Sequence, residues 1–240
     1  MNGPGQVFFV CGFGDPAAGL GGVAWDLGDP GAVLLSDGEV RPATFAIEEG
    51  GDASTLEITA GDTIAEAALS PRTAEIPLGG EVPGPTVVVC VAEVVPKQGA
   101  QVVRCPGQIS RWSRDPLEGA GTFRHLAIDA GDESLVVVLS HGDPGADHGD
   151  ERTGAWLIRG EEDTRFDDAF VSSQYDGEGD PTRFGVELWP EEAERASRAA
   201  ATRVAASPVG GARVGRAWAG LFRCQTDGVL GLGSYLLWRA

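Results

Sequence analysis

The chain has 240 residues and a formal net charge of −18 at pH 7. A charge of this sign and size opposes binding to nucleic acid or to an anionic membrane through the general electrostatic route. No apolar run approaches the ~18 residues of a transmembrane helix, and the N-terminal segment lacks the basic region of a secretory signal. We therefore expect a cytoplasmic protein with no nucleic-acid partner and no membrane span. Its length allows one large domain or two smaller ones.

Composition points to short strands joined by many turns. The chain contains 36 glycines and 15 prolines, yet 42% of its residues are hydrophobic, which favours a packed core over disorder. Four cysteines, Cys11, Cys90, Cys105 and Cys224, are far apart and form no CxxC pair. In a cytoplasmic chain this spacing indicates reduced, buried thiols. No cofactor is expected, with a divalent metal as the alternative considered below.

The first third of the chain is a series of short strand patterns. In residues 54–59, Thr55, Glu57 and Thr59 alternate with apolar side chains, the period of a half-buried antiparallel strand. Residues 79–85 are rich in glycine and proline and are the best linker candidate. We predict an N-terminal β lobe over 1–84 and a larger C-terminal β lobe over 85–240, or one continuous domain. Strands are expected at 6–12, 22–26, 31–36, 42–48, 54–59, 63–69 and 73–78.

Residues 86–95 and 101–111 are expected to form a hairpin. Glu93 interrupts a face of valines on its first strand, and Arg104 lies opposite it or one residue away. A carboxylate on an apolar face must be paired or have a raised pKa. Glu93 is therefore either an acid in an interior pocket or a structural residue, paired with Arg104 or facing solvent.

Residues 121–159 hold three expected strands, 122–129, 134–140 and 153–159, and all three histidines. The run of five apolar residues at 135–139 predicts a central strand that is covered on both faces. His125 lies within a strand, and a histidine there is either a hydrogen-bonded core residue or a general base.

The segment 141–151 combines two imidazoles with four carboxylates. These are ligand types for zinc, iron or manganese, so His141, His148, Asp143 and Asp147 are candidate metal ligands. A solvated acidic hairpin loop is the alternative interpretation.

A second hairpin is expected from 166–175 and 182–189. On its second strand Phe184, Val186 and Leu188 face one way, while Arg183, Glu187 and Trp189 face the other. Residues 190–206 begin with proline and two glutamates and are rich in alanine, which favours a helix. Strands at 212–224 and 229–239 close the chain.

About fourteen or fifteen short strands and at most one short helix predict an all-β protein. The antiparallel strands would form a large β-sandwich or two barrels side by side.

The closing half of the chain, from FRHLAID through YDGEGDPTRFGVELW to GLGSYLLWR, resembles the C-terminal part of two-barrel lipocalin-like proteins. That group includes carotenoid hydratases, tocopherol cyclases and related actinobacterial proteins of unknown function. The resemblance implies two lipocalin-like barrels, a strand instead of a helix over 198–206, and apolar small molecules as ligands. The first half departs from the group, because Gly22-Val23-Ala24-Trp25 has one residue more than a lipocalin Gly-x-Trp start.

The first functional hypothesis is therefore a β-barrel protein that binds a hydrophobic small molecule, either without reaction or as an enzyme that acts on a terpenoid or polyketide-like substrate. Proton transfer would fall to His125, Glu93 or Glu187. The ligand would be bound by Trp112, Trp156, Trp189, Arg104 and Tyr175. A non-catalytic structural or interaction protein and a metal-dependent enzyme using the 141–151 loop are the alternatives, and no oligomeric state is predicted.

Overall fold

The structure is a computed structural model that describes residues 7–15, 18–80, 84–96, 101–131, 134–166, 168–189, 196–209, 216–226 and 228–240. The side chains of His148 and of residues 205–209 also lie outside the described part. The described residues form two antiparallel sheets of nine strands each, and their one helical segment is the short 3-10 turn η1 (His148–Asp150). No membrane-crossing helix is found among them.

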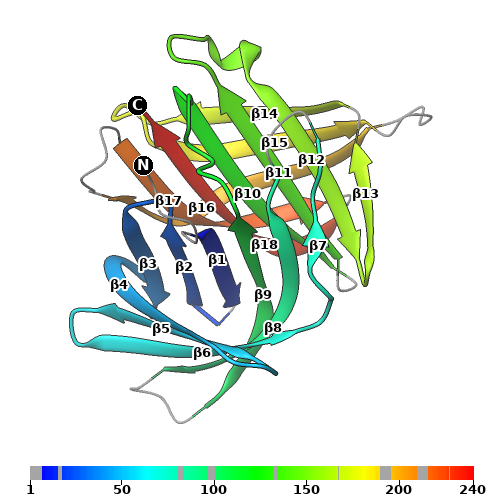
Figure 1. Ribbon diagram of the computed structural model, residues 1–240. Helices are drawn as coiled ribbons and strands as arrows, with labels where there is room; N and C mark the ends of the chain where they lie inside the picture. Colours follow the sequence, from blue (N-terminus) through cyan, green and yellow to red (C-terminus); the bar gives the residue numbers. More distant parts are fainter. Residues whose placement is uncertain are drawn as a thin grey trace.

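The first sheet contains the strands up to Trp112 in the order β6-β5-β4-β3-β2-β1-β9-β8-β7. Antiparallel pairing of β6 with β8 closes this sheet into a barrel, shown in blue to green in Figure 1. A cluster of apolar side chains that includes Phe13, Leu56 and Val94 fills its interior. Its strands are β1 (Phe8–Asp15), β2 (Leu20–Asp26), β3 (Pro30–Ser36), β4 (Glu39–Glu49), β5 (Ser54–Ala60), β6 (Thr63–Pro71), β7 (Ile76–Pro77), β8 (Thr86–Pro96) and β9 (Val103–Trp112).

The second sheet has the order β13-β12-β11-β10-β18-β17-β16-β15-β14 and curls into a second barrel-like unit. Its interior is packed with Phe184, Phe222 and Tyr235, whose rings contact one another, and with Trp218. Its strands are β10 (Thr122–Gly131), β11 (Ser134–Gly142), β12 (Arg152–Arg159), β13 (Glu162–Phe166), β14 (Asp168–Tyr175), β15 (Pro181–Trp189), β16 (Ser197–Val209), β17 (Arg216–Thr226) and β18 (Val229–Arg239).

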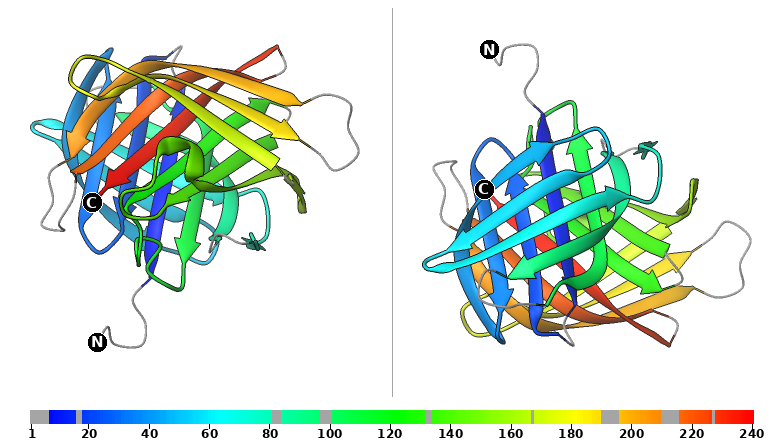
Figure 2. Two further views of the ribbon diagram at one scale, coloured as in Figure 1. Left: turned by 90° about the horizontal axis from the view of Figure 1, so that it is seen from above. Right: turned by 90° about the horizontal axis from the view of Figure 1, so that it is seen from below.

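The two barrels lie against each other and bury a third apolar core between them (Figures 1 and 2). Val10, Val23 and Val33 contribute from the first barrel, and Val137 and Trp156 contribute from the second. Glycine allows a close approach here, because a Cβ atom at Gly21 would come within 2.6 Å of the Leu221 side chain, which would have to move. Gly21 of β2 and Leu221 of β17 therefore pack against each other across the boundary between the barrels.

The central strand predicted around 135–139 is confirmed. Every residue of β11 is buried. Val136 and Val138 face the interior of the second barrel, while Leu135, Val137 and Leu139 face the core between the barrels. A strand between two cores is apolar on both faces, as its sequence predicted.

The boundary between the sheets lies after Trp112, whereas the sequence suggested a boundary at residue 84. Strands β8 and β9 pair with β6 and β1 and therefore belong to the first barrel. The glycine- and proline-rich segment at 79–85, of which 81–83 lie outside the described residues, indicates a turn but not which sheet the next strand joins.

The helix predicted over 190–206 is wrong where the structure describes it, because Ser197–Val209 form strand β16. Residues 190–195 lie outside the described part. Ala199 and Ala201 face the interior of the second barrel, and β16 pairs with strands on both sides. Sheet pairing therefore outweighs the helical propensity of alanine, and the strand implied by the family resemblance is confirmed.

Candidate functional site

Strands β9 and β10 face each other across the boundary between the barrels. At one end of this boundary Trp112 packs edge-on against Phe123 and His125. Next along it, Nε2 of His125 lies 3.1 Å from Oγ of Ser110, which donates to the side-chain oxygen of Gln108 at 3.0 Å. His125 is fully buried, and desolvation lowers its pKa to about 3, so its imidazole is neutral at physiological pH.

At the other end of the boundary between β9 and β10 lies a cleft. The inter-barrel cleft consists of three hollows of about 40, 300 and 400 Å³ that share Pro106 and Asp129 in their walls. Arg104, Cys105 and Gly107 of β9 form one side. The other side is formed by Leu135 of β11 and by residues of β18, among them Leu230 and Leu232.

Asp129 is the carboxyl group common to these hollows. Burial raises its pKa above the ordinary value, and the N–H of Gly131, which donates to Oδ1 at 3.0 Å, offsets part of that rise. The pKa is raised because the ionised form loses hydration in the cleft, so Asp129 takes up a proton more readily than an exposed aspartate does. A half-buried acid of this kind can donate a proton to a bound molecule.

The three predicted proton-transfer residues do not lie together. His125 is enclosed between the barrels. Glu93 is exposed on β8, directly opposite Arg104 in the strand register, as one predicted pairing required. Glu187 lies on the outer face of the second barrel, where it forms an ion pair of 3.2 Å with Arg198. The interpretation of Glu93 as an acid in an interior pocket is not supported, because its side chain faces solvent.

The predicted ligand-binding residues also separate. Arg104 lines two of the three hollows. Trp112 and Trp156 are buried in the core between the barrels, and Trp189 is half-buried at the end of β15. These tryptophans lie in different places and do not surround one cavity within the described part of the chain.

Tyr175 belongs to a polar cluster within the second barrel. The guanidinium of Arg124 donates to the phenol oxygens of Tyr175 and Tyr235 at 3.1 and 2.5 Å, and to both carboxylate oxygens of Glu151 at 2.8 Å. Ser140 also hydrogen bonds to Glu151. Burial by itself lowers the pKa of Arg124, but the hydrogen bond to Glu151 and the charges of Glu151, Tyr235 and Tyr175 together outweigh this effect and raise it. This cluster connects the 143–151 loop to the barrel wall.

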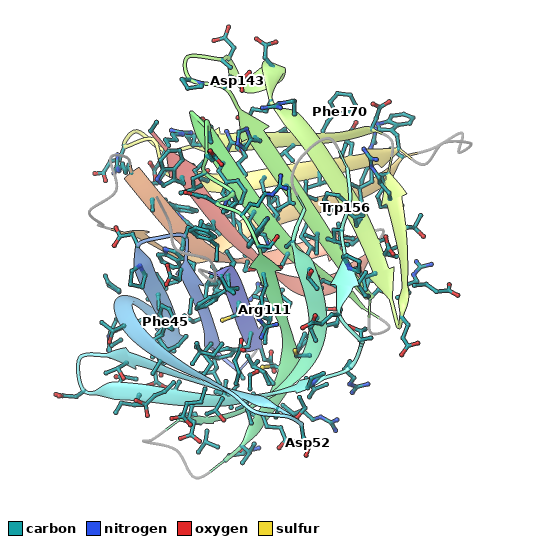
Figure 3. The ribbon with its side chains drawn as sticks, in the orientation of Figure 1. Phe45, Asp52, Arg111, Asp143, Trp156 and Phe170 are labelled. Carbon is teal, nitrogen blue, oxygen red and sulfur yellow. The ribbon has the colours of Figure 1, made fainter. Side chains whose placement is uncertain are left out.

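The 141–151 loop does not assemble the predicted metal site in the part of the chain that the structure describes. No three metal-ligating side chains converge among those residues, and the side chain of His148 lies outside them. Arg152 instead contacts Nδ1 of His141 at 3.3 Å and Asp143 at 3.0 Å. Asp143 lies at the outer tip of the second barrel in Figure 3, and Asp147 is exposed in the same loop. A guanidinium between the imidazole and the carboxylate repels a metal cation.

Sequence reasoning missed Asp129, Arg124 and Glu151. In the sequence Asp129 directly precedes Ala130 and Gly131, a pattern typical of a turn residue. The available signal was strand alternation, since Asp129 shares a face with His125 and Ala127 at a spacing of two residues. The partners of Arg124 lie 27 to 111 residues away in the chain, so no local pattern reveals them.

Comparisons with known proteins agree with this architecture. No family model matches the chain, and no curated protein matches its sequence. By structure it is similar to a Nitrosomonas europaea protein provisionally named AttH, with a TM-score of 0.68, 12% identity, and coverage of 97% of this chain and 90% of the other. The chain has the two-barrel lipocalin-like fold.

Two further structures share this two-barrel lipocalin-like fold. Kievitone hydratase from Nectria haematococca has a TM-score of 0.60 at 9% identity, and CghA with bound Sch210972 has a TM-score of 0.57 at 12% identity. Each comparison covers 98% of this chain and 88% of the other. At these identities the similarity shows the fold alone.

Proposed function

We propose that this protein binds a hydrophobic small molecule in the inter-barrel cleft and that Asp129 exchanges a proton with it. The observation that carries the proposal is the position of Asp129, a half-buried carboxyl with a raised pKa that borders all three hollows. Ligand sites in proteins are mostly apolar concavities with a few placed polar groups.

The walls of the cleft suit an apolar ligand. Leu135 and Leu232 provide apolar surface from the second barrel, and Val89, Val91 and Pro106 provide it from the first. A ligand covering Asp129 would remove further water from its carboxyl and favour the protonated form still more. The neutral acid could then donate its proton to an unsaturated carbon or a hydroxyl of the ligand, as a general acid does.

The structural neighbours support this class of function. One of them is named as a hydratase, and another was crystallised with the small molecule Sch210972. Hydration of a double bond and acid-catalysed cyclisation both need a positioned proton donor. A terpenoid or polyketide-like compound would provide the apolar body and the double bond that such chemistry uses.

The binding step is tested with Nile red, a neutral apolar dye. Pro106→Trp fills the point that the three hollows share, and we expect it to weaken dye binding by at least about tenfold. Val95→Trp places the same side chain on an exposed position of β8 and serves as the matched control. Equal dye binding by wild type and Pro106→Trp would contradict a ligand site in the cleft.

The proton-transfer step is tested in D₂O with the ligand that copurifies with the protein, identified by native mass spectrometry. We expect the wild type to incorporate deuterium into C–H bonds of the ligand and Asp129→Asn to slow this incorporation at carbon by roughly a hundredfold or more. If both proteins bind the ligand and neither exchanges deuterium, the protein is a binding protein and Asp129 has no chemical role.

A further inference from the structure

The outer face of the second barrel carries a groove of about 720 Å³ beside the inter-barrel cleft. The described residues that line this groove, which we call the arginine groove, include Arg183, Arg203 and Arg223 and no carboxylate. In a chain with a net charge of −18, this concave surface carries a local excess of positive charge from Arg183 and Arg223, because Arg203 is paired with Asp176.

The strand register produces the hollow shape. Gly185 lies opposite Ala200 on the neighbouring strand, and these two small residues lie between Ser172 and Gln225. Residues directly opposite each other on neighbouring strands point to the same side of the sheet. The surface of the sheet is therefore hollowed at Gly185 and Ala200, between the larger polar side chains of Ser172 and Gln225.

The next row of residues provides the charge. Arg183 lies opposite Thr202, and Thr202 lies opposite Arg223, so two guanidinium groups flank one hydroxyl across three strands. Arg203 forms an ion pair of 3.2 Å with Asp176. Arg183 and Arg223 have no ion-pair partner among the described residues, and their donors are free to bind an anion.

The arginine groove and the inter-barrel cleft share a border. Arg223 and Leu230 line both, and 70% of the Leu230 surface is exposed there. Arg223 on β17 lies opposite Leu232 on β18. On the other side of β18, Ile128 of β10 lies opposite Gly233, so the next residue, Asp129, lies beside Leu232. Asp129, Leu232 and Arg223 therefore lie at the same level of three adjacent strands.

We propose that the ligand of the inter-barrel cleft is an amphiphile with an anionic head group, a carboxylate or a phosphate, which binds Arg183 and Arg223 in the arginine groove. This inference rests on the proposed function, because the apolar body of the same molecule would occupy the cleft. Neighbouring strands are ~4.8 Å apart. Across the sheet, Asp129 is therefore two strands or about 10 Å from Arg223, and four strands or about 19 Å from Arg183. The head and the reacting part of the molecule would therefore be separated by an extended apolar chain.

The test compares parinaric acid, a fluorescent polyene fatty acid, with its uncharged methyl ester on the purified full-length protein at pH 8. We expect the wild type to bind the acid at least about tenfold more tightly than the ester, and this preference to fall at high salt. Arg183→Gln, outside the cleft, should weaken binding of the acid by about fivefold or more and leave the ester unchanged. Arg223→Gln, which also borders the cleft, should weaken binding of the acid by about fivefold or more and affect the ester less. Arg159→Gln, an exposed position on β12, is the matched control and should change neither.

The outcomes separate the two proposals. If acid and ester bind equally and the arginine variants have no selective effect, the anionic head is disproved while the apolar cleft stands. If only Arg223→Gln weakens the acid, the arginine groove is not the head-group site. If neither probe binds, both proposals fail. Displacement of parinaric acid by farnesoic acid or by farnesyl phosphate supports the anionic head and shows whether it is a carboxylate or a phosphate.

Discussion

The imidazole Nε2 of His125 lies 3.1 Å from the hydroxyl of Ser110, and this contact joins the two barrels across their apolar boundary. Ser110 is on the last strand of the first barrel, and His125 is on the first strand of the second. The neutral form of His125 is required here, because a buried imidazolium between two sheets would lose its hydration.

Stability should therefore fall as the pH is lowered. The pKa of His125 is about 3 in the folded protein and 6.5 in its unfolded reference state. Between these two pH values His125 is protonated in the unfolded chain and neutral in the folded protein. The free energy of unfolding therefore decreases as the pH falls, by about 1.4 kcal/mol per pH unit. Urea unfolding of the wild type and of His125→Gln at pH 7 and pH 5 measures the difference. Parallel pH slopes for the two proteins would contradict the assignment.

Removing the carboxylate of Glu151 should strongly destabilise the second barrel. Glu151→Ala leaves the buried Arg124 guanidinium facing the phenols of Tyr175 and Tyr235, at a cost of about 3–5 kcal/mol in the free energy of unfolding. Glu187→Ala breaks an exposed ion pair and is the control, with an expected cost below about 1 kcal/mol. Chemical denaturation compares the two variants, and similar losses for both would show that burial of the Arg124–Glu151 pair has no special role.

The four thiols should resist modification in the folded protein. Cys11, Cys90, Cys105 and Cys224 are buried and free, and desolvation raises the pKa of each to about 12. Because the thiolate is the reactive species, Ellman's reagent at pH 8 should label almost no thiol in buffer and all four in guanidinium chloride. Rapid labelling of one cysteine in buffer would contradict this burial and would point to Cys90 or Cys105, which both border the inter-barrel cleft.

Gly231 should be intolerant of a side chain. A Cβ atom at this position would come 2.2 Å from the carbonyl oxygen of Asp129, so β10 and β18 must separate to admit alanine. We expect Gly231→Ala to cost about 1–3 kcal/mol and to weaken Nile red binding, because it displaces the proposed proton donor. Gly177→Ala is the control, since a Cβ atom there meets nothing within 4 Å. A Gly231→Ala protein with wild-type stability would contradict the close approach of these two strands.

Most strands could be predicted from local pattern. The alternation at 54–59 and the apolar run at 135–139 gave β5 and β11 nearly to their ends. The prediction was wrong at β16, where alanine-rich sequence favours a helix until pairing with β15 and β17 is considered. The candidate site was predicted less well, and of the residues that border the inter-barrel cleft only Arg104 was proposed as a ligand-binding residue. Asp129 looks like an ordinary turn residue until the first barrel covers it.

The sequence by itself determined an all-β chain, its short strands and its acidic character, because strand period and turn chemistry are properties of neighbouring residues. Only the tertiary structure decided which strands close the first barrel, which face of β10 meets β9, and which acid lies in a cleft. Those outcomes depend on pairings between distant segments, such as β6 with β8 and Arg124 with Tyr235. Burial of an ionisable group depends on everything that packs around it, so the environment of Asp129 exists only once both barrels are in place.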